Sequence, residues 1–291
     1  MSLEARPVSG QATSLPRAGA VSGLSESSNW AEILAPYSHI VLVANSGTLD
    51  LADLQQRYPV TTLFVFFNKV YKTLDRPFEG HAVLVSRAQP KGANIVYRNE
   101  VSDVLSYFSN AHFLGILNIR LAANEKLNTS ADYKNAPTGH LDLLGYCDSF
   151  YTEGKTPTSG FAFALWLSEL RLRSEIVLAG FSAKRTDKWR VVSAHDWSFE
   201  QTFLRVFARL GKVTIQGGVS RNPYSELAQR FPEIPATDIA LAAAEVLSER
   251  LSNTDSEVDK LISLTNFIRA GDKFLRRINL RKVLRRRPAK G

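Results

Sequence analysis

Two titratable side chains stand near each other in the last third of the sequence, His195 and Glu200, with four residues between them. An imidazole titrates near neutrality, so His195 can take a proton from a hydroxyl at physiological pH. A carboxylate one helical turn further on can orient the site, or it can cap and hold the helix. We select His195 and Glu200 as the candidate catalytic residues; a structural histidine at a helix start is the alternative.

A helix start precedes this pair. Thr158, Ser159 and Gly160 come directly before an apolar segment, Phe161 to about Leu172, that has the length and pattern of a buried helix. Hydroxyls and a glycine are good N-cap residues, and the free N–H groups of a helix start bind anions. A phosphate is therefore expected here, unless Ser159 merely caps a core helix.

Basic residues lie between this helix and His195. They are Lys184, Arg185, Lys188 and Arg190. Arginine and lysine are common ligands of phosphate, so the loop is a candidate phosphate clamp. The alternative is an ordinary solvated loop.

Polar residues also follow two buried strands near the start of the chain. Asn45, Ser46 and Gly47 come after the run at 39–44, and Asn68 comes after the run at 61–67. Ligands collect at the carboxyl ends of parallel strands, and an amide can both donate to and accept from a base edge or a sugar hydroxyl. We expect a nucleotide there. A GxGxxG motif is absent from the sequence, which argues against a dinucleotide.

The segments that position these residues predict an α/β fold. Strands are predicted at 39–44, 61–67, 81–87, 93–98, 113–119, 175–180 and 212–216, and helices at 29–36, 49–58, 100–108, 161–172 and 199–210. The alternation predicts a mostly parallel, Rossmann-like sheet with helices on both faces. Residues 120–153 lack periodicity, so we expect a functional loop or lid. Beyond residue 222 the pattern is helical.

Three regions are expected along the 291 residues: a disordered leader at 1–28, a catalytic α/β domain at 29–220 and a helical C-terminal region at 221–291. Residues 260–291 hold eleven Lys or Arg and one acid, a charge of +10, so the rest of a chain with +8 carries −2. The acidic body argues against a nucleic-acid partner. The basic, amphipathic tail predicts an anionic membrane surface as partner, or a helix packed on the body.

The compartment follows from two further features. Cys147 is the only cysteine, so an intramolecular disulfide is impossible and a reducing compartment is expected. No apolar run in the sequence reaches the ~20 residues of a spanning helix. We expect a cytoplasmic protein, peripheral on the inner membrane.

With these pieces placed, the sequence resembles the CMP-sugar sialyltransferases of glycosyltransferase family 29, with echoes of the bacterial family 42. The run Val41 to Gly47 resembles the start of the family's large motif, and Asn68 matches the Asn that ends its next strand. Thr158 to Gly160, the following helix and the strand 176–180 with Phe181 resemble the small motif. His195 and Glu200 match the short final motif. The similarity covers roughly residues 38–210.

Two departures qualify the resemblance. The family has a His and aromatic residues after a Trp before the final motif, whereas Trp189 is followed here by Arg190, Val191 and Val192. The family's disulfide between its large and small motifs is impossible with one cysteine. The first departure implies altered handling of phosphate or acceptor, and the second suits a bacterial cytoplasmic relative.

The resemblance implies an inverting, GT-A-like transferase that moves a sialic acid or related keto sugar from its CMP ester to a glycan or glycolipid hydroxyl in bacterial surface polysaccharide synthesis. It implies Asn45, Ser46, Gly47, Asn68, Thr158, Ser159 and Gly160 as nucleotide-binding residues. No metal is expected, because one phosphodiester charge can be balanced by protein donors and the sequence has no Asp-x-Asp. The alternatives are a CMP-Kdo-dependent Kdo transferase of the same fold and a catalytically inactive nucleotide-binding or membrane-associated protein.

Overall fold

The computed structural model describes residues 14–25, 27–46, 49–87, 94–108, 111–181 and 194–216, and in a second unit residues 227, 229–235, 237–249 and 251. The chain divides into two compact units, residues 1–218 and 219–291. The first unit contains every described candidate residue.

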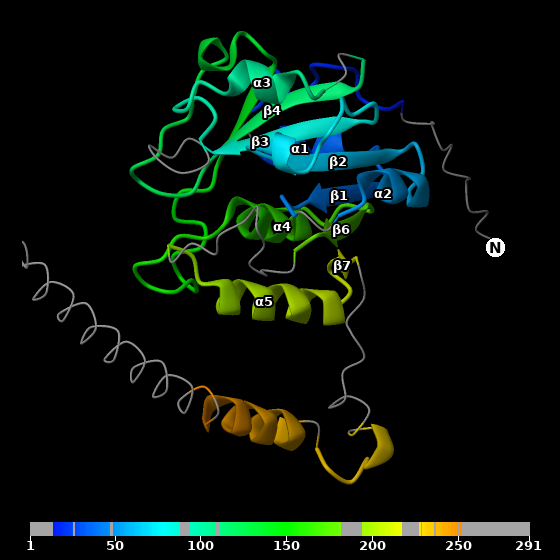
Figure 1. Ribbon diagram of the computed structural model, residues 1–291, viewed down its shortest axis with the longest axis vertical. Helices are drawn as coiled ribbons and strands as arrows, with labels where there is room; N and C mark the ends of the chain where they lie inside the picture. The colour runs from blue at the N-terminus through cyan, green and yellow to red at the C-terminus, as the bar shows by residue number, and fades with distance from the viewer. Residues whose placement is uncertain are drawn as a thin grey trace, which may run out of the picture. The chain divides into compact units, whose positions relative to one another are not determined.

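A parallel sheet forms the centre of the first unit (Figure 1). Its strands lie in the order β5-β4-β3-β2-β1-β6-β7, and every pair of neighbours is parallel. The bounds are β1 His39–Val43, β2 Thr62–Phe67, β3 Ala82–Arg87, β4 Phe113–Arg120, β5 Thr138–Asp142, β6 Glu175–Ala179 and β7 Thr214–Ile215. The expectation of an α/β fold with a parallel sheet is confirmed.

Helices cover both faces of this sheet. The helices are α1 Ser27–Leu34, α2 Leu51–Arg57, α3 Val101–Leu105, α4 Ser159–Glu169 and α5 Trp197–Arg209, with short 3₁₀ turns η1 Val70–Lys72 and η2 Ala131–Tyr133. One core joins α1, α4 and α5 to one face of the sheet, and a second joins α2 and α3 to the other. Successive residues of β1 illustrate the division, because Ile40 and Leu42 enter the first core while Val41 and Val43 enter the second. Apolar runs without alternation are what a sheet buried on both faces requires.

The helix α4, Ser159–Glu169, begins two residues earlier than the expected range 161–172 and ends three residues earlier. The side chain of Thr158 accepts a hydrogen bond from the N–H of Phe161 at 3.2 Å, so Thr158 is the N-cap and Ser159 is the first helical residue. Every residue from Phe161 to Leu167 is buried. The helix therefore lies in the core with its N-terminus at the carboxyl edge of the sheet.

Two expected elements are wrong. Residues 94–98 form turns instead of a strand, because the Asn94 side chain accepts hydrogen bonds from the N–H groups of Val96 and Tyr97. The supposed loop at 120–153 contains the edge strand β5 and the turn η2. Among the strands, β5 has a weak pattern because its sequence, TGHLD, contains a single large apolar residue.

The leader expected at 1–28 is ordered in its described part. The N–H of Gly19 donates to the carbonyl of Phe113, and the N–H of Val21 donates to the carbonyl of Leu114. The N–H of Gly23 donates to the carbonyl of Thr138. Val21 is fully buried. Residues 14–25 therefore belong to the folded unit, because they supply hydrogen bonds and an apolar side chain to β4 and β5.

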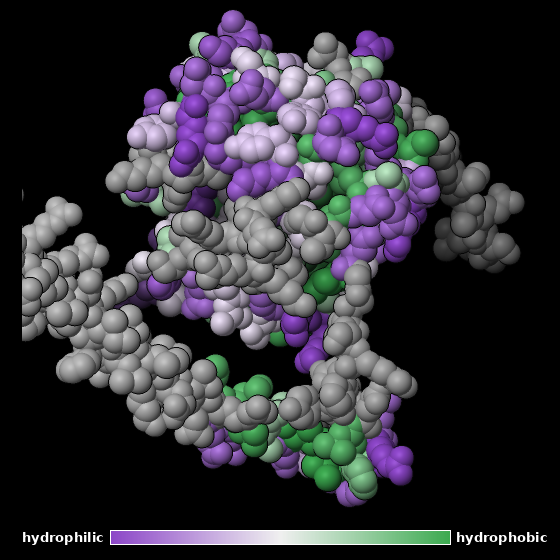
Figure 2. Space-filling model, in the orientation of Figure 1, coloured by the Kyte–Doolittle hydropathy of each residue, from purple (hydrophilic) through white to green (hydrophobic). Residues whose placement is uncertain are grey.

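The second unit is described in part. Residues 237–249 are helical, as the sequence pattern predicted. Figure 2 shows apolar surface on the second unit, and its exposed large side chains include Leu241, Val246, Leu247 and Leu251. The basic tail predicted to bind membranes lies outside the described residues. In the part of the chain that the structure describes, no helix is long and apolar enough to cross a membrane.

Candidate functional site

The direction of the strand order changes at β1. Strands β2 to β5 follow β1 on one side of the sheet, while β6 and β7 lie on its other side. In open α/β sheets the crevice at such a point, outside the carboxyl ends of the strands, is where ligands bind. The loop after β1 meets the end of β6 there: the N–H of Ala44 donates to the carbonyl of Ala179 at 2.9 Å, and Gly180 packs against Ser46 and Leu49.

The two asparagines predicted to bind a nucleotide lie at this edge. The Nδ2 of Asn45 donates to the carbonyl of Phe67 at 2.9 Å, so its amide ties the end of β1 to the end of β2. The neighbouring Asn68 has a left-handed backbone, with φ 41°, and its Oδ1 accepts from the N–H of Arg87 at 3.1 Å. The structure thus places Asn45 and Asn68 together and uses part of each amide to join three strand ends.

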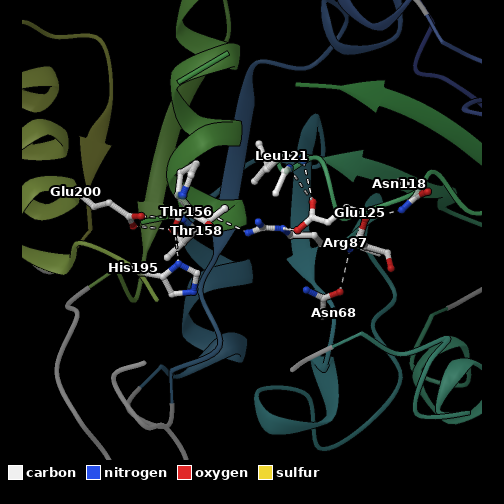
Figure 3. A network of polar contacts seen from close by, with 12 residues as sticks. Asn68, Arg87, Asn118, Leu121, Glu125, Thr156, Thr158, His195 and Glu200 are labelled. Carbon is white, nitrogen blue, oxygen red and sulfur yellow. Dashed lines mark hydrogen bonds and ion pairs between the residues drawn. The ribbon is translucent and has the colours of Figure 1, made fainter. Parts of the chain in front are cut away.

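A short segment, Thr156, Pro157 and Thr158, leads into α4 and is held by side chains from distant elements (Figure 3). We call these three residues the anchor segment. The carbonyl of Thr156 accepts from His195, the carbonyl of Pro157 accepts from Arg87, and both the N–H and the hydroxyl of Thr158 donate to Glu200. The start of α4 is therefore fixed residue by residue.

His195 lies two residues before α5, next to the N-cap Asp196, with its ring edge-on to Trp197 at 5.4 Å between ring centroids. Its Nδ1 is 2.6 Å from the carbonyl oxygen of Thr156. A carbonyl oxygen can only accept, so the neutral ring carries its proton on Nδ1 and keeps a lone pair on Nε2. Burial lowers the pKa of His195 and the positive charge of Arg87 lowers it further, against the opposing effect of the Thr156 hydrogen bond. At neutral pH the ring is a neutral acceptor.

Glu200 does a different job from the histidine. It lies on α5 and is 3% exposed, so it is shielded from solvent. Its carboxylate accepts from the N–H and the hydroxyl of Thr158 and from the hydroxyl of Tyr151, each at 2.7 Å. Burial raises the pKa of Glu200, and these hydrogen bonds and the charge of Arg87 oppose the rise. Glu200 therefore joins α5 to the start of α4.

The sequence patterns did not single out Arg87, at the end of β3. Its Nε donates to Glu125 at 2.6 Å and its Nη1 donates to the carbonyl of Pro157 at 2.8 Å. The side chains of Arg87 and Glu125 are 6% and 0% exposed, so this is a buried ion pair. Its position in the sequence could have identified it. Arg87 is the last residue of the apolar run 82–87, just as Asn45 and Asn68 follow the apolar runs of β1 and β2.

Tyr151 and Asp196 were also not predicted from the sequence as candidate site residues. The N–H of Asp196 donates to the hydroxyl of Tyr151 at 3.0 Å, and that hydroxyl donates to Glu200. Asp196 caps α5 by accepting from the N–H of Phe199 at 2.9 Å. A tyrosine and an aspartate 45 residues apart carry no joint sequence pattern, so only the fold reveals that they hold His195 and Glu200 in register.

A cavity of about 350 Å³ adjoins the loop after β1. Ser46 and Leu49 line it from that loop, Gln55 from α2, and Lys72 and Thr73 from the turn after β2. Its size lies within the range of small-molecule sites. The cavity places Ser46, one of the predicted nucleotide-binding residues, beside an available space.

The remaining predicted residues divide into two groups. Ser159 and Gly160 form the first turn of α4, where Gly160 lets the helix approach Phe181 so closely that a Cβ would lie 2.7 Å from that ring. Gly47 and the candidate phosphate clamp, Lys184, Arg185, Lys188 and Arg190, lie outside the described residues. Within the described ranges no group of three or more His, Cys, Asp or Glu side chains is placed to hold a metal ion.

Comparison with protein-family models, with curated proteins and with solved structures finds no match to this chain.

Proposed function

We propose that the chain is an inverting glycosyltransferase that moves a sialic acid or related keto sugar from its CMP ester to a glycan hydroxyl. One observation carries the proposal: the half-buried imidazole of His195, with Nδ1 bound to the Thr156 carbonyl, offers Nε2 as a base beside the start of α4. The motif resemblance at residues 41–47, 68, 158–160 and 195–200 supplies the substrate class.

The chemistry needs a base at one end and donors at the other. The acceptor oxygen forms a bond to the anomeric carbon, the bond from that carbon to the phosphate oxygen breaks, and Nε2 of His195 takes the proton of the acceptor hydroxyl. The departing phosphate of CMP carries the developing negative charge. The N–H groups of Ser159 and Gly160, in the first turn of α4, lie where a helix stabilises an anion.

The nucleoside is assigned to the other part of the edge, near Asn45, Ser46 and Asn68. Supporting this assignment are the carboxyl-end position of all three residues and the adjoining cavity. The donor carries one phosphodiester charge, which the start of α4 can balance without a metal ion. We expect thermal stabilisation by CMP and not by UDP or GDP, and turnover that survives EDTA. Stabilisation by UDP alone, or activity abolished by EDTA, would contradict the proposal.

Replacement of the base is the direct test. In His195→Asn, CMP binding should persist because the nucleotide is held elsewhere, while turnover falls by ~10² to 10⁴. Asn keeps a donor for the Thr156 carbonyl but has no basic nitrogen. If the variant keeps wild-type kcat, or loses activity only in proportion to the folded fraction, His195 is not the base.

The pH profile gives a second readout of the same residue. The base works only when neutral, so the rate should fall as pH drops through the pKa of His195. Because burial lowers that pKa, the fall should occur below the ordinary imidazole value of about 6.5. Assays with CMP-activated sialic acid and CMP-Kdo in parallel select the donor. Binding of CMP without hydrolysis or transfer of either sugar would indicate the inactive nucleotide-binding alternative.

A further inference from the structure

Arg87 is placed between the two halves of the proposed site. Its backbone N–H binds the amide oxygen of Asn68, and its guanidinium binds the carbonyl of Pro157 in the anchor segment. Pro157 lies between Thr156, which holds His195, and Thr158, which holds Glu200. One residue on β3 therefore connects the asparagine edge of the sheet with the segment that orients the imidazole.

The guanidinium is itself held rigidly. Glu125 accepts from Arg87 Nε with one carboxylate oxygen, and with the other it accepts from the N–H groups of Leu121 at 2.8 Å and Ala122 at 3.3 Å. Both side chains are almost completely buried. A buried ion pair is poor evidence for stability, because desolvation of the two charges offsets their attraction. Such a pair at the edge of a candidate site therefore needs another explanation.

Burial of the whole guanidinium, with Nη2 included, indicates that Arg87 does more than stabilise the fold. This atom is buried and has no hydrogen-bond partner among the described residues. An apolar side chain would fill the space without the desolvation of a buried charge. What the guanidinium provides, and an apolar residue cannot, is a donor to Pro157 and a positive charge beside the imidazole.

We propose that Arg87 is a positioning residue for His195: held by Glu125, it fixes the anchor segment through the Pro157 carbonyl, and the anchor segment holds the ring in its Nδ1–H tautomer. The proposal rests on the proposed function, in which His195 is the base. Rigid support of this kind matters because a small misplacement of a catalytic group costs much of its effect.

The charge of Arg87 adds a second effect. Charged groups around the anchor segment come from β3 (Arg87), from the turn after β4 (Glu125) and from α5 with its cap (Glu200 and Asp196). Of these groups, Arg87 disfavours a second positive charge on His195, because it lowers the pKa of the imidazole. The same side chain therefore favours the neutral form that a base requires.

The test uses two variants and one control. The double variant Arg87→Met with Glu125→Met removes both charges, so that neither is left buried alone. Arg87→Lys keeps the charge but lacks the planar fork that reaches two acceptors. The control is Arg120→Met, because Arg120 also ends a strand, β4, and pairs with a carboxylate, Asp142, but at the surface. Nuclear magnetic resonance titration of the His195 ring, with its signals identified by their loss in His195→Asn, reports pKa and tautomer.

In the double variant the pKa of His195 should rise, the neutral ring should become a mixture of tautomers, and kcat should fall roughly 10- to 100-fold with little change in KM for the donor. Arg87→Lys should keep the wild-type pKa and still lose kcat and tautomer purity. Arg120→Met should change none of these quantities. The measurement of kcat depends on the proposed function. The titration of the His195 ring does not, because it needs no turnover.

An unchanged titration and tautomer in the folded double variant would overturn the proposal. If the double variant does not fold, Arg87→Lys decides, and a wild-type tautomer in that variant would also overturn it. If the wild-type chain proves inactive toward CMP sugars, the proposed function fails, while the ring titration still decides whether Arg87 positions His195.

Discussion

Histidine residues with lowered pKa values lie at both edges of the sheet. His195 is near the carboxyl edge, where a carbonyl fixes its tautomer. His81 lies just before β3, at the amino edge, where its Nδ1 is 3.2 Å from the hydroxyl of Tyr37 and its ring is 4.8 Å from that of His112. Burial lowers the pKa of His81, and the neighbouring His112 lowers it further. The residue type is the same, and the surroundings determine whether it is a candidate base or a structural group.

His81 should contribute to the pH dependence of folding. Its pKa in the folded state is below the unfolded value of about 6.5, so the unfolded state binds the proton more tightly. The stabilisation is present above pH 6.5 and is lost as pH falls through the folded-state pKa. His81→Gln should therefore show a smaller fall in the free energy of unfolding between pH 7.5 and pH 5.5, measured by urea denaturation. Equal falls in the two proteins would show that His81 does not contribute.

For single residues, the sequence predicted which side chains belong to the candidate site better than it predicted what each side chain contacts. His195, Asn45 and Asn68 were found because each follows or precedes a recognisable element. Glu200 was found by spacing, yet its function as the link to Thr158 depends on a contact between residues 42 positions apart. Arg87 and Pro157 are 70 positions apart, and their contact depends on how β3 and α4 are arranged in the fold. Local sequence patterns contain no information about such pairs.

Among the elements, the junction of β1 and β6 depends on Gly180. This glycine has φ 77°, and a Cβ added there would lie 2.3 Å from Leu49 Cδ1 and 3.0 Å from Ser46 Cβ. A side chain at this position is disfavoured by the backbone and also displaces the loop that carries Ser46. The closeness of the loop after β1 to β6 is therefore a consequence of one residue without a side chain.

Gly180→Ala tests this junction against Gly154→Ala. Gly154 has φ 70° and nothing within 4 Å of the added Cβ, so its replacement should cost only about 1–2 kcal/mol of backbone strain. Gly180→Ala should cost about 1–3 kcal/mol more, because Leu49 and Ser46 must move, and it should also weaken CMP binding. Urea denaturation and thermal shift with CMP measure the two effects. Equal stabilities in the two variants would show that the close contact is relieved without cost.

Elements were predictable where burial is strong and local. The six-residue runs of β2 and β3 are buried at every position, and such runs are recognisable without tertiary information. The edge strand β5 was missed because Gly139 approaches Trp30 and the carbonyl of Val21, a contact that needs a residue without a side chain. The run Ile95 and Val96 was misread as a strand because the preceding Asn94 directs the backbone into a turn.

At the scale of the whole molecule, charge and site lie in different parts of the chain. The candidate base, its support and the asparagine edge all belong to the first unit, residues 1–218, which holds 22 Lys or Arg and 19 Asp or Glu, a net charge of +3. Most of the positive charge lies in residues 260–291, which hold eleven Lys or Arg and one acid, a net charge of +10. We propose that this separation lets the tail place the enzyme on an anionic surface while the first unit performs the transfer, with a lipid-linked glycan as the acceptor.

Deletion of residues 273–291 tests this division. The segment holds nine Lys and Arg and no acid, and each basic residue near an anionic leaflet is worth ~1 kcal/mol. Its apolar residues, among them Phe274, Leu275 and Ile278, can share one helical face. The shortened protein should lose binding to phosphatidylserine vesicles in a sedimentation assay while keeping turnover on a dissolved acceptor.

Two controls make the deletion specific. Removal of residues 2–13, which hold one Glu and one Arg, should leave vesicle binding unchanged because the net charge does not change. Raising the salt concentration should weaken binding of the full chain, since screening shortens the range of the attraction. If the protein without residues 273–291 still sediments with anionic vesicles, the attachment depends on another surface. The exposed apolar side chains of residues 241–251 would then be the next candidates, because their contribution is insensitive to charge and would persist at high salt.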